Sequence, residues 1–186
     1  MSNAEYWSQY AESSDSNYNE EMAKFIRDLA VSLRSQNVLE VGCSSGNDLK
    51  LFSKDLDVSG VDPNESAIRK AVQNLPHFKF RVGSVTDLPF EDSTFDFVFA
   101  RNVLNHIDSS DIEKSLNEMF RVSRKYVLNV EFFSESENPV QDTPIPTLGR
   151  NMYRRWQNFK VKIISNVDMH EEIDPRKSKF TLVRKI

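Results

Sequence analysis

Short apolar runs alternate with helical patterns along the first 133 residues, and this rhythm limits the possible folds more than any other feature. The pattern predicts strands at residues 38–41, 58–61, 78–82, 95–100 and 126–133, and helices at residues 19–34, 47–56, 64–74 and 111–122. The predicted strands are continuous apolar runs, which is typical of strands buried on both faces. We therefore expect an α/β fold with a doubly wound, Rossmann-like, mostly parallel sheet and helices on both faces.

The last third of the chain departs from this rhythm. Residues 161–167 and 180–186 are apolar runs joined by a polar loop, which predicts a C-terminal antiparallel hairpin that closes the sheet. Residues 134–149 contain three prolines and are long for a connection, so we expect a functional loop there. Residues 152–158 after it predict a short helix.

Composition limits the class of protein. The length of 186 residues suits one domain. The net charge of −4 argues against a nucleic-acid partner, because binding to phosphates usually needs a basic surface. The single cysteine, Cys43, excludes an intramolecular disulfide and a multi-cysteine metal site, and we expect no metal. The sequence has no apolar run of membrane-spanning length and no basic-then-apolar start, so we expect no membrane association and a cytoplasmic location.

The turn after the first predicted strand is rich in small residues. Gly42 allows a sharp turn and a close approach to a ligand, and Gly46 opens the next element. A dinucleotide fingerprint would need glycine at the positions of Ser44 and Asn47, so that pattern fails. Asp62 ends the second strand, 20 residues after Gly42, where a carboxylate can accept hydrogen bonds from ribose hydroxyls. The alternative is that Asp62 only caps the following helix.

Three segments together resemble a known family. Residues 40–46 resemble the E-x-G-x-G-x-G signature of class I S-adenosylmethionine-dependent methyltransferases, with Ser44 in place of the middle glycine. Residues 83–96 resemble the G-D-A-x-x-L-P-F…S-F-D segment of small-molecule members, and residues 97–107 resemble the segment that ends in a Leu-x-His pair. The resemblance implies S-adenosylmethionine as cofactor, S-adenosylhomocysteine as product and a small-molecule acceptor.

The resemblance also implies a set of cofactor contacts. These are Glu40, Gly42, Cys43, Ser44, Gly46, Asp62, Pro63, Ser84, Val85, Arg101 and Asn102. The family places an aspartate on the adenine amino group where this chain has Ser84, so either Ser84 or Asp87 is expected to make that contact.

Methyl transfer depends mainly on alignment, which supplies roughly 7–11 kcal/mol. A general base is needed only when the acceptor carries a proton of high pKa. His106 and Glu131 are the catalytic residues that we expect in that case, and a purely structural role is the alternative for both.

Two further segments are expected on the acceptor side. Arg150 and Arg154 are spaced i, i+4 and are predicted to share a helix face that binds an anionic acceptor, although such a face is more often simply solvated. The aromatic cluster of Tyr6, Trp7, Tyr10 and Tyr18 resembles a lid over the cofactor, with Tyr10 toward the substrate, and plain packing is the alternative.

A narrower resemblance is to methylases associated with pseudaminic acid biosynthesis, carried by residues 83–85, 103–107 and 126–133. Those methylases have Tyr-Arg-Gly where this chain has Thr-Leu-Gly at residues 147–149, so this resemblance does not assign their sugar-like acceptor to this chain. A nucleic-acid or protein methyltransferase and a non-catalytic cofactor-binding regulator are the alternatives. The oligomeric state stays open.

We predict one domain over residues 1–186. Its parts are an N-terminal lid and helix (1–35), a cofactor-binding core (38–133), an acceptor-side loop with a short helix (134–158) and a C-terminal hairpin (159–186).

Overall fold

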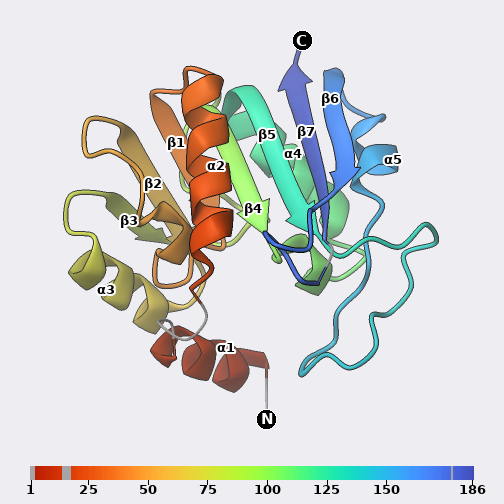
Figure 1. Ribbon diagram of the computed structural model, residues 1–186, viewed down its shortest axis with the longest axis horizontal. Coiled ribbons are helices and arrows are strands. Elements are labelled where there is room, and N and C mark those ends of the chain that lie inside the picture. The colour runs from red at the N-terminus through yellow and green to blue at the C-terminus, as the bar shows by residue number, and fades with distance from the viewer. Residues whose placement is uncertain (1–2, 14–17, 177) are drawn as a thin grey trace.

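The computed structural model describes residues 3–13, 18–176 and 178–186, and within these ranges one sheet dominates the molecule (Figure 1). Its strands are β1 (Asn37–Val41), β2 (Asp57–Asp62), β3 (Lys79–Val82), β4 (Phe95–Arg101), β5 (Ser123–Glu131), β6 (Val161–Asp168) and β7 (Lys179–Lys185). The order across the sheet is β3-β2-β1-β4-β5-β7-β6. Strands β1 to β5 pair in parallel, whereas β7 is antiparallel to both β5 and β6. The predicted fold, including its C-terminal hairpin, is confirmed.

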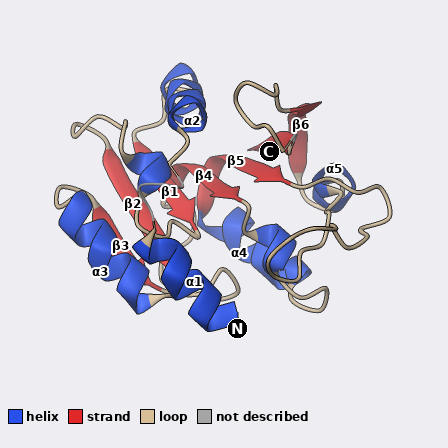
Figure 2. Ribbon diagram, turned by 60° about the horizontal axis from the view of Figure 1, so that its bottom comes forward, coloured by secondary structure: helices blue, strands red, loops and turns tan. Residues whose placement is uncertain are grey.

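Helices cover both faces of this sheet (Figure 2). Helix α2 (Glu20–Ser32) packs on one face, while α4 (Ile112–Val122) and α5 (Met152–Trp156) pack on the other. Successive strand residues point to opposite faces, so in β1 Val38 joins the α2 cluster and Leu39 joins the α4 cluster. Both side chains are fully buried, which explains why adjacent positions of the strand are apolar rather than only alternate ones.

Asparagine caps fix where two helices begin. The Asn19 side chain accepts a hydrogen bond from the Met22 N–H at 3.0 Å, and α2 starts at Glu20. The Asn64 side chain accepts from the Ser66 and Ala67 N–H groups, and α3 (Glu65–Asn74) starts at the next residue. Asn64 is therefore the N-cap of α3, and Asp62 contacts the start of this helix only by accepting a hydrogen bond from the Asn64 N–H at 2.9 Å.

One prediction about local structure is wrong, and one helix was not predicted. Residues 47–56 form only a short 3₁₀ helix, η1 (Asn47–Leu49), followed by turns. The Ser53 hydroxyl accepts from the Asp55 N–H at 3.2 Å, a local side-chain bond that competes with helix continuation. The aromatic segment at the N-terminus is itself a helix, α1 (Asn3–Glu12), which the sequence did not indicate.

The order of the strands places a crevice beside the first one. Strand β1 lies between β2 and β4. From β1 the chain continues to β2 and β3 on one side, and it then crosses to β4 and β5 on the other side, so the strand order reverses at β1. Ligands bind outside the carboxyl ends of the strands at such a switch point. Figure 1 shows α1 and the loop formed by residues 134–149 below this edge, at the carboxyl ends of the parallel strands.

Candidate functional site

A cavity of about 880 Å³ lies at this edge of the sheet. It is lined by residues at the ends of β1, β2 and β4, by the aromatic side chains of α1, and by part of loop 134–149. Ligand pockets for drug-sized molecules span about 300–1,000 Å³, so this one has room for a large cofactor and a small second ligand. The cavity therefore has the position and size expected of a two-substrate site.

The turn after β1 exposes backbone to the cavity. Gly42 has a φ of +73°, and a Cβ at this position would lie 2.3 Å from a Val103 methyl group, so no side chain fits. Ser44 is also left-handed, with a φ of +46°, and its N–H donates to Asp62 Oδ2 at 2.9 Å. Gly42, Cys43 and Ser44 all line the cavity. The turn is thus held open by glycine and fixed by the carboxylate of the next strand.

Asp62 lines the cavity at the end of β2. One carboxylate oxygen accepts from Ser44 and the other from the Asn64 N–H, also at 2.9 Å. Burial raises the pKa of Asp62, and these two backbone hydrogen bonds partly oppose that increase. A carboxylate oxygen has two lone pairs and can accept two hydrogen bonds, so Asp62 retains capacity for two neighbouring hydroxyl groups of a ligand.

The buried oxygens beside this turn that have no hydrogen-bond partner within the described part of the chain include two from the cavity wall. They are Glu40 Oε2, at the end of β1, and Asn102 Oδ1, directly after β4. Both residues line the cavity, and Asn102 holds a left-handed φ of +53°. Burial raises the pKa of Glu40 well above its ordinary range. Unpartnered buried acceptors are costly, so a ligand that donates hydrogen bonds, such as an ammonium group, fits here.

An ion pair between Arg101 and Asp48 closes the same region. The Arg101 guanidinium donates to both oxygens of Asp48, with Nη2 at 2.9 Å from Oδ1, and both side chains are nearly buried. Both residues line the cavity. Arg101 was a predicted cofactor residue, but Asp48 was missed. Its position two residues after Gly46 was the available signal.

His106 lies on the cavity wall in a second 3₁₀ helix, η2 (Leu104–His106). Its Nδ1 is 3.4 Å from the Pro146 carbonyl oxygen, and its ring meets Trp7 edge-on at 5.0 Å between centroids. The Thr147 hydroxyl is 3.5 Å from the same nitrogen. Because a carbonyl oxygen only accepts, the tautomer that forms the Pro146 hydrogen bond carries its proton on Nδ1 and has Nε2 as an acceptor. Burial lowers the pKa of His106, the Pro146 contact opposes this, and the charge of Arg176 adds to the decrease. The ring is therefore neutral at pH 7.

Glu131 does not line the cavity. It is buried at the end of β5, where its carboxylate accepts from the N–H groups of Val103, Leu104 and Asn105 at 3.1–3.3 Å. Burial raises the pKa of Glu131 to about 8, although these three donors oppose the shift. The structure thus corrects its expected catalytic role: Glu131 positions the segment that bears His106.

The aromatic wall of the cavity comes from α1. Tyr6, Trp7 and Tyr10 line the cavity, as expected of the N-terminal cluster, whereas Tyr18 lies outside its lining. Lys70 of α3 anchors the helix, because its Nζ donates to the carbonyl oxygens of Ala11 at 3.0 Å and Glu12 at 2.7 Å. Lysine at the C-terminal carbonyls of a helix is favourable for the helix dipole.

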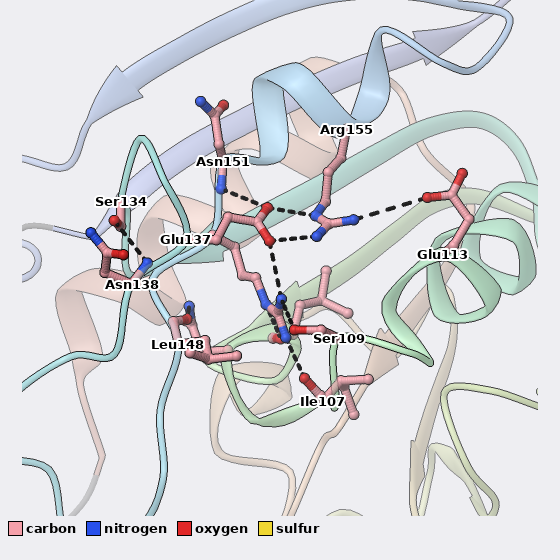
Figure 3. Close-up of polar contacts among 12 residues, drawn as sticks. Ile107, Ser109, Glu113, Ser134, Glu137, Asn138, Leu148, Asn151 and Arg155 are labelled. Atoms are coloured by element: carbon pink, nitrogen blue, oxygen red, sulfur yellow. Dashed lines mark hydrogen bonds and ion pairs between the residues drawn. The ribbon is translucent and has the colours of Figure 1, made fainter.

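Loop 134–149 is tied to the His106 segment by a cluster of Glu137, Arg150 and Arg155, which we call the clamp. The Arg150 side chain is 0% exposed and donates to the carbonyl oxygens of Leu104 and Ile107, to Ser109 Oγ and to Glu137 Oε2. Figure 3 shows Glu137 also meeting Arg155, whose Nε lies 2.6 Å from Oε1. Burial alone would raise the pKa of Glu137, but the hydrogen bonds from Arg155 and Arg150 lower it.

The two arginines predicted for the acceptor are not brought to the cavity. Arg150 precedes α5 instead of sharing a helix face with Arg154, and its charge is neutralised within the clamp described above. Arg154 is 68% exposed and pairs with Glu135 at the surface. The i, i+4 reasoning failed because the helix starts only at Met152.

Three predicted cofactor residues also lie outside the lining. Gly46 instead provides the left-handed entry to η1, with a φ of +82°. Val85 is buried in the core, and the exposed Ser84 hydroxyl is 2.8 Å from that of Thr86 within its own turn. Asp87, the alternative adenine contact, does not line the cavity either.

Arg176 is a charged residue of the cavity lining that sequence reasoning missed. It lies in the turn between β6 and β7 and lines the cavity. The sequence showed only a polar loop there, and nothing indicated that the hairpin would bring this loop to the cavity. Within the described residues no cluster of three or more His, Cys, Asp or Glu side chains is suited to a metal ion.

Residues 38–126 match the family model described as a methyltransferase domain. The chain carries a class I S-adenosylmethionine-dependent methyltransferase domain. Among curated proteins, this chain is 32% identical over 105 residues to an uncharacterized methyltransferase of Schizosaccharomyces pombe, covering 49% of this chain and 37% of that protein. It is 30% identical over 118 residues to a phosphatidylethanolamine N-methyltransferase of Cereibacter sphaeroides, covering 59% and 57%. The chain thus spans less than two thirds of each of these relatives.

Solved structures share the fold of the methyltransferase domain. Magnesium protoporphyrin IX methyltransferase from Synechocystis PCC 6803, solved with bound SAM, superposes with a TM-score of 0.68. The two chains are 11% identical, and the match covers 89% of this chain and 80% of the other. Within the described residues, no helix is long and apolar enough to pass through a bilayer.

Proposed function

We propose that this protein transfers the methyl group of S-adenosylmethionine to a hydroxyl or amine of a small molecule, with His106 as general base. The observation that carries the proposal is the joint lining of one cavity by Asp62, by the unpartnered oxygens of Glu40 and Asn102, and by a neutral histidine. The family match at residues 38–126 supports the same cofactor.

The residues present fit this cofactor. Asp62 suits the two ribose hydroxyls, and the open Gly42 turn leaves room for the sugar. Glu40 and Asn102 offer acceptors for the ammonium group of the methionine part. When bound, the cofactor supplies a methyl carbon on a sulfonium: the acceptor lone pair bonds to that carbon, the carbon–sulfur bond breaks, and its electron pair remains on sulfur.

His106 provides for the proton of the acceptor. With Nδ1 donating its proton to the Pro146 carbonyl, Nε2 is the atom that takes the proton from the hydroxyl oxygen or amine nitrogen of the acceptor. The surroundings are fixed before any ligand arrives, because Glu131, Arg150 and Trp7 all contact η2 or the ring itself. The wall formed by Tyr6, Trp7 and Tyr10 limits access of water to the sulfonium.

Formation of S-adenosylhomocysteine from S-adenosylmethionine tests the proposal, with pools of small hydroxyl and amine compounds as acceptors. We expect turnover with at least one pool, and His106→Gln to lower kcat by about 10²–10⁴-fold. Binding of S-adenosylhomocysteine should be unchanged in that variant. His77→Gln is a matched control, since His77 lies outside the cavity lining. Equal turnover by wild type and His106→Gln would refute the assignment of the base.

A further inference from the structure

Arg176 occupies the end of the cavity farthest from Asp62. The strands that separate them run in the order β2-β1-β4-β5-β7, and Arg176 precedes β7 closely. Neighbouring strands lie about 4.8 Å apart, so roughly 19 Å separates the end of β2 from the edge at β7. A cofactor bound over β2, β1 and β4 leaves this end to the methyl acceptor.

The guanidinium of Arg176 is held in place from two sides. It lies over the Phe132 ring, with its central carbon 5.2 Å from the ring centroid, and its Nε is 3.4 Å from Asp174 Oδ1. Asp174 is itself buried and accepts from the N–H groups of Arg176 and Ser178, which fixes the turn. Stacking on an aromatic ring orients the planar fork of an arginine.

The outer edge of this fork remains available. Within the described ranges, Nη1 and Nη2 have no hydrogen-bond partner, and the contact with Asp174 is longer than the 2.7–2.9 Å usual for a charged pair. Asp142 of loop 134–149 also lines the cavity but forms no ion pair with Arg176 in the described structure. Arg176 is therefore paired with Asp174 through Nε, while its Nη1 and Nη2 groups keep their hydrogen-bonding capacity.

The neighbours of Arg176 define what else the acceptor meets. Phe132, Tyr6 and Trp7 line the same cavity, so the body of the acceptor lies against aromatic faces. The positive charge of Arg176 lowers the pKa of His106, in addition to the effect of burial. Arg176 and His106 therefore line one cavity, so that a single ligand can contact both.

We propose that Arg176 binds a carboxylate or phosphate of the methyl acceptor through its two Nη groups, and that this acceptor is a small oxyanion with a flat, apolar body. The inference rests on the proposed function, because it assigns the acceptor end of the same cavity. Loss of a bidentate contact to an oxyanion is expected to weaken binding tenfold or more, about 1.4 kcal/mol or above.

Calorimetric titration with benzoate, phenyl phosphate and the neutral isostere benzamide tests this inference. We expect benzoate or phenyl phosphate to bind wild type at least tenfold more tightly than benzamide. Arg176→Gln should remove that preference, and Arg176→Lys should retain part of it because the charge remains. Arg154→Gln is the matched control, since it removes an exposed arginine outside the cavity. The tighter of the two anions shows whether carboxylate or phosphate is the preferred group.

Several results would overturn the inference. These are equal affinity for benzoate and benzamide, absence of binding by every probe, or unchanged anion binding in Arg176→Gln. Loss of S-adenosylhomocysteine affinity in that variant would instead assign Arg176 to the cofactor. Titrations are run with and without S-adenosylhomocysteine, so failure of the cofactor to bind would refute the proposed function while the anion titration still decides the role of Arg176.

Discussion

The clamp around Glu137 gives a stability prediction whose size follows from burial. In Glu137→Gln the buried Arg150 loses its counter-charge, although it keeps its contacts with two backbone carbonyls and Ser109. Removing one partner of a buried ion pair costs about 3–5 kcal/mol. Because Glu137 is 22% exposed and these neutral acceptors remain, we expect the lower end, about 3 kcal/mol.

Thermal unfolding measures this loss. For a chain of this size, about 3 kcal/mol lowers Tm by roughly 6–12 °C. Glu135→Gln is the matched control: it lies two residues away and also pairs with an arginine, but both side chains are about two-thirds exposed. Such a pair contributes about 0–1 kcal/mol. If the two variants unfold within 1 °C of each other, the reasoning from burial is refuted.

Three further predictions concern the site. Gly42→Ala should abolish measurable cofactor binding in calorimetry, because its Cβ would overlap Val103; wild-type affinity would contradict the geometry of the turn. The pKa of Glu131 rises from 4.5 to about 8 on folding, so the folded state binds more protons between these values and stability falls as pH rises through that window. Glu131→Gln should lack this fall in unfolding experiments from about pH 5 to 9, and a parallel fall in both proteins would exclude Glu131 as its source. The pKa of His106 lies below the ordinary histidine value of 6.5, so kcat/KM should fall to half of its plateau only below pH 6.5; a half-maximum at pH 7 or above would contradict a neutral base.

The sequence was sufficient for the fold because its strongest signals are local and repeated. Continuous apolar strands, asparagine caps and the proline-rich connection each act within a few residues. The helix predicted at residues 47–56 does not form because the Ser53 hydroxyl accepts a hydrogen bond from the Asp55 N–H and stabilises a turn instead.

The candidate site was predictable at the cofactor end and not at the acceptor end. Gly42, Asp62 and Asn102 follow strands of a parallel sheet, and such strand ends meet at one edge in every fold of this class. Arg176 reaches the cavity only because β7 pairs antiparallel with β5, a long-range contact that no local pattern reveals. Arginine is a residue type that often contacts anionic ligands, but Arg150 is part of the clamp instead. Only the burial of its side chain in the structure distinguishes these two roles.

The most direct test of the account is calorimetric titration of the protein with S-adenosylmethionine, comparing wild type, Asp62→Ala and Asp28→Ala. Asp28 is an exposed carboxylate on α2 outside the cavity. We predict micromolar binding that Asp62→Ala weakens tenfold or more, about 1.4 kcal/mol, and that Asp28→Ala leaves unchanged. Absence of binding by wild type, or equal affinity of all three proteins, would contradict the assignment of this cavity to the cofactor.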